Sequence, residues 1–306
     1  MSAVASTTRA PRPFGVRFGS FMRNQHPVLN IILLLVAIFW LVPSVGLAVI
    51  SLRPEADFTQ SGWWTVLGTP SHLTFANYQT LFAQGFKPGG LLDSLLTSIA
   101  ITIPTTVLVT ALSSSTAYSL VFGRWPGRDV ALLIIVGLLV VPLQMALIPV
   151  DQIYNVVYSA TGVHIFGTVA GVVIFHVAFG LPFGIFLMRN FYMGIPRDLL
   201  EAGRIDGAGD WNLFRRVVLP IGLPAVASLA IFQFIWVWND LLVALVFLGG
   251  STHYPLTVFL LNQTRTFSAS YWVISTGAMI SIVIPLIVFF SFQRYFVQGV
   301  LAGSVK

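Results

Sequence analysis

Charged residues, cysteine and lysine are scarce in this sequence. Of its 306 residues, 56% are hydrophobic and only 8% are charged, whereas an average soluble protein carries about 25% charged residues. This number of charged side chains is too small to cover a globular surface in water. We therefore expect most of the surface to face lipid. The absence of cysteine excludes disulfides, thiolate nucleophiles and cysteine-based zinc sites, and it leaves the redox compartment undetermined.

The chain has two lysines, Lys87 and Lys306, so no G-x-x-x-x-G-K-[ST] phosphate-binding loop can be written. The H-E-x-x-H and G-x-S-x-G motifs are also absent. We therefore expect that the chain is not an enzyme and binds no cofactor itself. The net charge of +6 does not indicate nucleic acid as a partner, because the basic residues lie in short segments between apolar runs, as in membrane proteins.

Six apolar runs are long enough to cross a bilayer as helices. Their length and lack of strict alternation exclude barrel strands, so the sequence predicts an all-α polytopic membrane protein with six transmembrane helices. We expect a tail over residues 1–27, a six-helix transmembrane domain over 28–293 with a charged loop at 189–218, and a second tail over 294–306. The predicted spans are Val28–Leu52, Leu95–Val121, Val130–Val150, Phe166–Met188, Leu219–Leu248 and Val273–Phe292.

The distribution of basic residues predicts the orientation. If the N-terminus is cytoplasmic, only Arg53, Lys87 and Arg265 lie outside. The excess of Lys and Arg on one side predicts that both termini are cytoplasmic. The other thirteen of the sixteen basic residues are then inside: Arg9, Arg12, Arg17, Arg23, Arg124, Arg128, Arg189, Arg197, Arg204, Arg215, Arg216, Arg294 and Lys306.

The segment between the fourth and fifth spans carries the most informative sequence. Pro196 suits the first turn of a helix, the stretch Gly207 to Gly209 should end that helix, and Asp210 is a reasonable N-cap for a second one. Four acidic and four basic residues lie between Arg197 and Arg216. Since their charges cancel, we expect two short helices that form a docking surface and not a basic lipid-binding patch.

This segment resembles the EAA loop of binding-protein-dependent ABC importer permeases. The similarity extends over nearly the whole chain, and the sugar-permease branch is resembled most, in particular the smaller permease of maltose-type importers. Gly203 departs from the alanine that is usual in the motif, and glycine lowers helix propensity by about 1 kcal/mol. The residues that carry the coupling motif are Glu201, Ala202, Gly203, Asp206, Gly207, Ala208, Phe214, Leu219 and Pro220.

The resemblance implies a type I ABC importer permease fold in the inner membrane of a bacterium. It also implies several partners: a second related permease, two ATPase subunits that bind ATP and Mg, and an extracytoplasmic sugar-binding protein. In such a heterodimer this loop docks into the ATPase, the loop Gly249 to Phe267 reaches toward the binding protein, and the C-terminal tail contacts the ATPases.

A polar cluster within the fifth apolar run is the candidate substrate path. A charge at the bilayer centre costs about 2.5–3.5 kcal/mol on insertion scales, so Asp240 should face protein or water. Trp236 and Trp238 are able to stack on a sugar ring, with Gln233 and Asn239 beside them. The alternative is that these residues serve as interfacial aromatics and hydrogen-bond partners between helices, and for each single residue this alternative is favoured.

Other polar and small residues in the spans favour packing roles. The second span is rich in Ser and Thr, and Gly180 and Gly184 form a small-xxx-small pair, which allows close helix approach. We expect His176 to make structural hydrogen bonds, with proton transfer as the alternative. Prolines that should kink helices are Pro104, Pro142, Pro149 and Pro182.

Three functions remain open on sequence alone. The first is a subunit of an ATP-driven importer for a sugar, such as an oligosaccharide or glucoside, or for a non-sugar small solute. The second is an ion-coupled secondary sugar transporter, which should have more buried ionisable groups than Asp240 and His176. The third is a membrane enzyme that acts on lipid-linked sugars, against which the lack of paired carboxylates argues.

Overall fold

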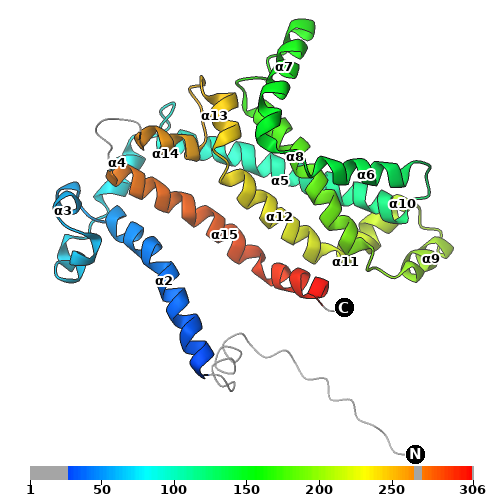
Figure 1. Ribbon diagram of the computed structural model, residues 1–306, viewed down its shortest axis with the longest axis horizontal. Helices are drawn as coiled ribbons and strands as arrows, with labels where there is room; N and C mark the ends of the chain where they lie inside the picture. The colour runs from blue at the N-terminus through cyan, green and yellow to red at the C-terminus, as the bar shows by residue number, and fades with distance from the viewer. Residues whose placement is uncertain (1–26, 265–270, 305–306) are drawn as a thin grey trace, which may run out of the picture.

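The computed structural model describes residues 27–264 and 271–304, and all regular structure in that part of the chain is helical (Figure 1). Residues 1–26, which include most of the expected N-terminal tail, lie outside the described residues, as do Arg265 to Phe267 at the end of the loop expected to reach the binding protein. The α-helices are α2 (Pro27–Ser51), α3 (Glu55–Gln60), α4 (Ala76–Ala83), α5 (Leu91–Phe122), α6 (Arg128–Leu138), α7 (Leu143–Thr161), α8 (Val169–Tyr192), α9 (Arg197–Ile205), α10 (Asp210–Leu213), α11 (Leu219–Ile221), α12 (Leu223–Trp238), α13 (Leu242–Leu248), α14 (Leu256–Thr264) and α15 (Tyr271–Ser304).

Four helices, α2, α5, α8 and α15, are long and apolar enough to cross a membrane by themselves. Two further spans are possible if each of two bent helix pairs counts as one crossing. The prediction of a helical protein with up to six crossings is therefore confirmed. The last helix continues to Ser304, beyond Phe292, where the predicted sixth span ends.

The predicted third span, Val130–Val150, is not one continuous helix. Two helices, α6 and α7, replace it and meet at an angle of 107°. Pro142 lies at the break as the N-cap of α7. Because proline disfavours the helical conformation of the residue before it, Val141 cannot continue α6. Pro142 therefore breaks the helix completely, while Pro104, Pro149 and Pro182 lie inside helices α5, α7 and α8.

The predicted fifth span, Leu219–Leu248, is also interrupted. The helical stretch from Asp210 to Ile221 meets α12 at 76°, and α12 ends at Trp238 before α13 begins. At the first break, a Cβ on Gly222 would lie 2.7 Å from the Tyr192 ring. Glycine therefore allows the chain to turn closely against the end of α8.

The polar segment after the first span is held to the end of α2. Arg53 is 3% exposed and donates to the carbonyls of Gly62, at 2.9 Å, and Asp57, at 3.2 Å. The Asn77 side-chain amide bonds to the carbonyls of Ser51 and Arg53, both at 2.9 Å. The bond to Ser51 satisfies a carbonyl in the last turn of α2, which lacks a partner within the helix, and the other bonds tie the following loop to it.

Helices α5, α8 and α12 form the centre of the molecule, and α15 packs along α12 (Figure 1). A Cβ on Gly184 would collide with the Ser113 hydroxyl and lie 3.0 Å from the Ser113 Cβ, and a Cβ on Gly180 would lie 3.0 Å from Val109. The packing role predicted for the glycine pair is therefore confirmed. Without side chains at these two positions, α5 and α8 approach closely.

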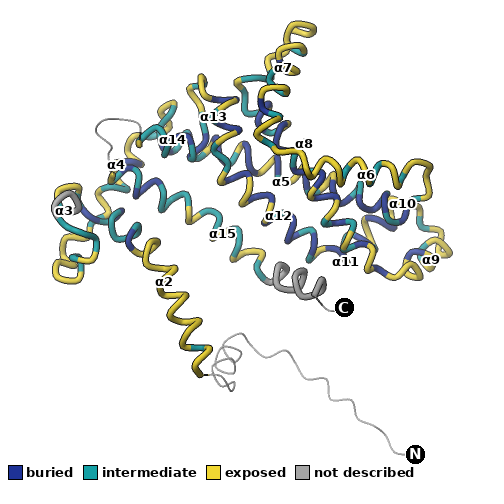
Figure 2. The backbone as a smooth tube through the Cα atoms, viewed as in Figure 1, coloured by how far each residue is buried: buried dark blue, intermediate teal, exposed yellow. Residues whose placement is uncertain are grey.

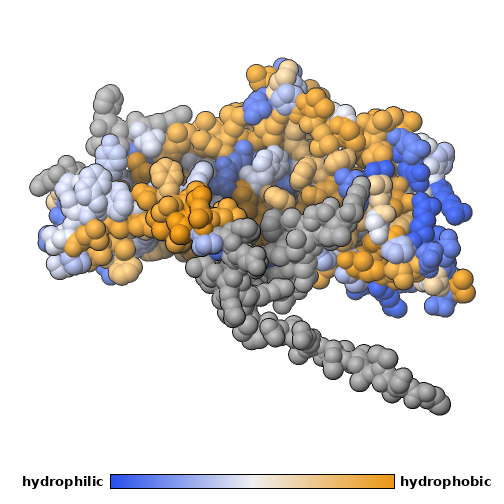
Figure 3. Space-filling view, turned by 60° about the horizontal axis from the view of Figure 1, so that its bottom comes forward, coloured by the Kyte–Doolittle hydropathy of each residue, from blue (hydrophilic) through white to orange (hydrophobic). Residues whose placement is uncertain are grey.

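The exposed surface is largely apolar. Figure 2 shows that most of α2 is exposed, and this helix is among the most hydrophobic of the chain. Figure 3 shows hydrophobic residues over the length of the molecule and hydrophilic residues gathered at the end where α9 and α10 lie. An exposed surface of this kind is stable in lipid but not in water.

Candidate functional site

The coupling motif forms two short helices joined by a sharp turn. Helix α9 ends at Ile205, and Gly207 takes a positive φ of 82°. The amide of Ala208 donates to the Gly203 carbonyl at 2.9 Å, and that of Gly207 to the Arg204 carbonyl at 3.0 Å. These two bonds form a Schellman motif, in which glycine avoids the strain that a side chain would bring. The glycine stretch therefore ends the helix as predicted.

Asp210 does not cap α10, contrary to the prediction. Gly209 is the N-cap, and no side chain bonds to the first amides of α10. Asp210 is instead the first residue of the helix, where its carboxylate accepts from the Tyr118 hydroxyl at 3.4 Å and from Arg204 at 3.3 Å. Gly209 has the extended conformation that precedes the helix, and Asp210 links α5, α9 and α10.

Gly203 lets the two helices pack closely. A Cβ at this position would lie 2.5 Å from Cδ2 of Leu213, a residue that is 1% exposed. Glycine replaces the usual alanine at position 203 because Leu213 fills the space that an alanine methyl group would need.

An apolar cluster joins α9 and α10 to the spans. Phe214 is 7% exposed, and its ring lies 5.3 Å from Tyr118 and 5.6 Å from Trp211, between centroids. It begins a π-helical turn, η3 (Phe214–Val218), and such turns are rare and often lie at functional sites. The cluster also contains Ala117, Phe122, Met188, Tyr192, Ile195, Leu200, Val218, Ala225 and Leu229.

The outer face of this segment is exposed and mixes charged with apolar side chains. Glu201, Ala202 and Asp206 are exposed, and so are Ile205, at 86%, and Trp211, at 67%. Leu219 is partly buried and Pro220 is exposed at the start of α11. The charged and apolar groups together form a surface of the kind that protein interfaces use.

Two of the five candidate path residues have structural roles. Trp238 is 3% exposed, donates from Nε1 to the Ser281 carbonyl at 3.1 Å and stacks on Phe234. Asp240 caps α13, because its Oδ2 accepts the amides of Val243 and Ala244 at 3.1 and 3.2 Å. The Trp238 bond is an inter-helix hydrogen bond of the kind that the alternative describes, whereas the Asp240 bonds lie within its own segment.

The Asp240 carboxylate also lies 3.5 Å from Nε2 of His176, which is 1% exposed. The imidazole ring of His176 meets Trp236 edge to face, at 5.3 Å between centroids. The contact joins α8 to the break between α12 and α13, which fits the structural role expected for this histidine. In the described part of the chain, no three His, Cys, Asp or Glu residues are grouped in a way that could hold a metal ion.

Gln233 and Trp236 lie together in a groove between α8 and α12. The groove has a volume of about 270 Å³ and is lined by Phe179, Gly180, Phe183, Phe232, Gln233 and Trp236. Asn239 lies in a different hollow, with residues of α15. The five candidate path residues therefore divide between this groove, the separate hollow at Asn239 and the helix packing around Trp238 and Asp240.

The Gln233 amide is the polar group of this groove. Its side chain is 3% exposed and Nε2 has no hydrogen-bond partner. It lies over Gly180, where a Cβ would come within 2.8 Å of Nε2. A buried donor without a partner is costly.

Sequence analysis missed the three phenylalanines of the groove. Phe179 and Phe183, and likewise Phe232 and Trp236, are four residues apart, a spacing that places two side chains on one helix face. The signal was present in the sequence, but in two helices with many aromatic residues the facing pairs are apparent only once α8 and α12 are placed side by side.

Comparisons with known proteins place the chain among transport-system membrane proteins. Residues 76–302 match the family model of the binding-protein-dependent transport system inner membrane component. The chain is 42% identical over 283 residues to the osmoprotective compounds uptake permease protein GgtD of Synechocystis sp., covering 92% of this chain and 93% of that protein. It is 46% identical over 239 residues to the alpha-glucoside transport system permease protein AglG of Rhizobium meliloti, covering 78% and 62%, respectively.

The fold is also found among solved transporters. A chain of a bacterial ABC transporter involved in the import of the acidic polysaccharide alginate superposes with a TM-score of 0.71 at 21% sequence identity, over 94% of this chain and 100% of that one. The type I importer permease fold expected from the sequence is therefore confirmed. With the family match over residues 76–302, this chain belongs to the inner-membrane components of binding-protein-dependent transport systems.

Proposed function

We propose that this chain is the permease subunit of an ATP-driven importer of a small carbohydrate. The observation that carries the proposal is the α9–α10 segment, which exposes Glu201 and Asp206 on one side and is held to α5, α8 and α12 by buried residues on the other. A partner that moves this surface must also move the ends of the spans. Such a connection is what coupling to a separate ATPase requires.

The partners that we propose follow from the family. A second related permease completes the translocation path, two ATPase subunits bind ATP and Mg and dock on α9 and α10, and an extracytoplasmic binding protein delivers the substrate. Both termini are cytoplasmic in this arrangement, and the chain crosses the bacterial inner membrane. The excess of arginine on the side of the α9–α10 segment supports this orientation.

The coupling step is a rigid-body motion of the docked segment. Closure of the ATPase dimer pushes on α9, and the buried contact of Phe214 with Tyr118 transfers the displacement to α5. Alternating access then follows from movement of the helices around the path. Glu201, which lies on the exposed face of α9, pairs with a basic residue of the ATPase.

The groove between α8 and α12 is the part of the path that we assign to substrate. Its aromatic rings offer flat apolar surfaces for the C–H face of a sugar ring, and the Gln233 amide offers a donor and an acceptor for hydroxyl groups. AglG is named for alpha-glucosides, and GgtD for osmoprotective compounds. A small alpha-glucoside, or an osmoprotective compound of similar size, is therefore the first substrate to test.

The first test is to purify the tagged chain in mild detergent from its native membrane and to identify the proteins that co-purify. The second is to measure substrate uptake in cells that carry the wild-type chain or a variant at Glu201. We expect an ATPase and a second polytopic subunit to co-purify with the wild-type chain. The Glu201→Lys variant should insert normally but lose the ATPase and the uptake of alpha-glucoside, because it brings two like charges together. The Glu201→Gln variant is the matched control, which removes the charge without reversing it.

Wild-type uptake by Glu201→Lys would refute the docking assignment. A preparation without ATPase that still transports in liposomes, with uptake that collapses under an uncoupler while ATP is clamped, would establish an ion-coupled secondary transporter instead. Normal ATP-driven transport without uptake of any carbohydrate would keep the importer and refute the carbohydrate assignment.

A further inference from the structure

Three arginines from different elements surround a small cavity at the end of the spans. The cavity has a volume of about 110 Å³, and since a water molecule occupies about 30 Å³ in the liquid, a phosphate group fits inside it. It lies where α5 ends, α6 begins, α8 ends and α9 begins. Its lining residues are Leu120, Val121, Arg128, Asp129, Leu132, Arg189, Met193 and Arg197.

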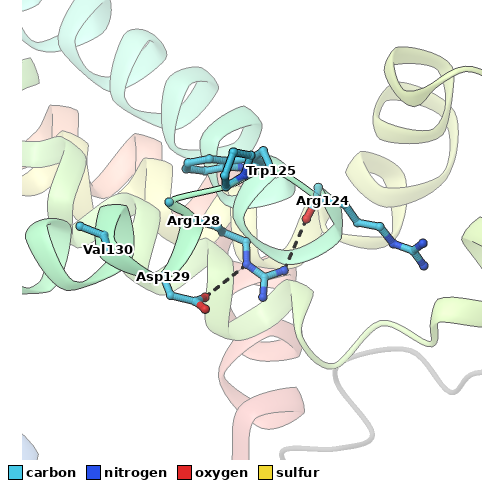
Figure 4. Close-up of a pocket in the computed structure, with 8 residues that line it drawn as sticks. Arg124, Trp125, Arg128, Asp129 and Val130 are labelled. Atoms are coloured by element: carbon cyan, nitrogen blue, oxygen red, sulfur yellow. Dashed lines mark hydrogen bonds and ion pairs between the residues drawn. The ribbon is translucent and has the colours of Figure 1, made fainter.

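The cavity is positively charged. Three arginines and one aspartate give its lining a net charge of +2 (3 − 1). Arg128 donates from Nε to Asp129 at 3.4 Å and from Nη1 to the Gly123 carbonyl at 3.4 Å, and Figure 4 shows its guanidinium between these two groups. Since both side chains of the pair are partly or mostly exposed, at 37% and 86%, the pair is weak and an incoming phosphate can replace the carboxylate.

The surroundings of the cavity are apolar on the side of the spans. Leu120, Leu132 and Met193 contribute to its lining, and α6 continues from it with an exposed apolar face, on which Leu133 is 71% and Ile134 is 60% exposed. A site that combines arginines at the end of membrane-spanning helices with an apolar strip along one of them matches a molecule with an anionic head and hydrocarbon chains.

We propose that this cavity binds the headgroup of an anionic phospholipid. Arg128, Arg189 and Arg197 hold the phosphate, and the acyl chains lie along the exposed face of α6. Arg197 is the first residue of α9, so a bound lipid ties the coupling segment to the ends of α6 and α8. The occupied site therefore limits how far α9 moves independently of the membrane.

The apolar lining favours a lipid over an acidic segment of a partner protein. The recess lies at the level where the spans end and is lined in part by α6, whose exposed apolar residues a soluble partner would leave uncovered. Trp125, which lines an adjoining hollow with Arg124 and Arg128 (Figure 4), is of the residue type enriched at headgroup level.

The experiment measures binding of phosphatidylglycerol to the purified, delipidated transporter by native mass spectrometry, with phosphatidylcholine as the zwitterionic comparison. Arg128→Gln, Arg189→Gln and Arg197→Gln should each weaken binding about fivefold, since a basic residue near an anionic membrane surface contributes about 1 kcal/mol. The triple variant should lose binding of phosphatidylglycerol almost completely. Arg215→Gln is the matched control, because Arg215 is exposed in η3 but does not line the cavity.

A second readout separates the lipid from other ligands. ATP-driven uptake in liposomes should depend on phosphatidylglycerol for the wild-type transporter and become independent of it for the triple variant. If the glutamine variants aggregate, Arg→Lys variants keep the charge but lose the planar fork, and they should retain most of the binding and of the lipid dependence.

Three results would overturn the proposal. The first is equal binding of phosphatidylglycerol by the wild-type and triple-variant transporters. The second is complete displacement of the lipid by inorganic phosphate, which would make the cavity a site for a soluble anion. The third is loss of the co-purifying ATPase in the triple variant with unchanged lipid binding, which would make it a protein contact.

Discussion

The substitution Phe214→Ala should uncouple the motion of the α9–α10 segment from the motion of the membrane-spanning helices. The Phe214 ring is 7% exposed and packs on the rings of Tyr118, at 5.3 Å, and Trp211, at 5.6 Å. Removal of a buried phenylalanine side chain costs about 3–5 kcal/mol, because it loses apolar burial and leaves a cavity. Phe214 is the only aromatic residue that η3 contributes to the cluster. We therefore expect its removal to cost this full amount of packing energy.

The substitution Asp210→Ala removes the polar link between the same elements and should matter much less. Its two contacts are long, 3.4 Å to Tyr118 and 3.3 Å to Arg204. The carboxylate is 75% exposed and the Arg204 side chain is 42% exposed, so solvent screens the ion pair. Surface pairs of this kind contribute about 0–1 kcal/mol, and apolar packing therefore dominates the attachment of the segment.

The assay is substrate uptake per ATP hydrolysed in liposomes that contain the complete transporter. Phe214→Ala should lower this ratio severalfold while the ATPase still hydrolyses ATP, and Asp210→Ala should stay within about twofold of wild type, as its weak contacts imply. Phe214→Leu, which keeps much of the apolar volume, is the control and should lie between them. An equal loss of coupling in Asp210→Ala and Phe214→Ala would refute the conclusion that packing transmits the motion.

Three further predictions concern single positions. Gly184→Val should lower the thermal stability of the purified transporter, because its side chain collides with Ser113 on α5, whereas Val at the exposed position Ile174 should leave it unchanged. Gly207→Ala should cost about 1–2 kcal/mol of local stability, since its φ of 82° lies in the left-handed region, and it should make α9 more accessible to protease. Trp236→Ala should raise the KM for uptake with little change in the amount of transporter, and an unchanged KM would remove this residue from the path.

The number and position of the apolar runs predicted the helices well, because a 20-residue apolar segment in lipid has few alternatives to a helix. Breaks within the runs were harder to predict. Pro142 was expected to kink a helix, yet it separates α6 from α7 at 107°. The degree of bending depends on whether neighbouring helices can satisfy the freed backbone groups, which a single run does not reveal.

The backbone turn of the α9–α10 segment was predicted more accurately than the contacts of the candidate path residues. Glycine and proline fix the backbone locally, so the turn at Gly207 follows from the sequence. The path depends on contacts between distant helices. Asp240 was expected to face protein or water, and it does so as the cap of α13 beside His176, but its polar character alone could not distinguish a cap from a substrate ligand.

The aromatic groove lies on α8 and α12, and the α9–α10 segment connects these two helices along the chain. This arrangement suggests how a motion of the segment controls the groove. Phe183 in the groove is nine residues from the end of α8 at Tyr192, and Phe232 is nine residues from the start of α12 at Leu223. At a rise of 1.5 Å per residue, each groove wall lies about 14 Å along its helix from the helix end that faces the α9–α10 segment. Helix α8 is locked to α5 through Gly184, whereas α12 follows directly from the coupling segment through α11. A push on α9 should therefore reach α8 and α12 by different routes, and the width of the aromatic groove between them is the quantity that this motion should change.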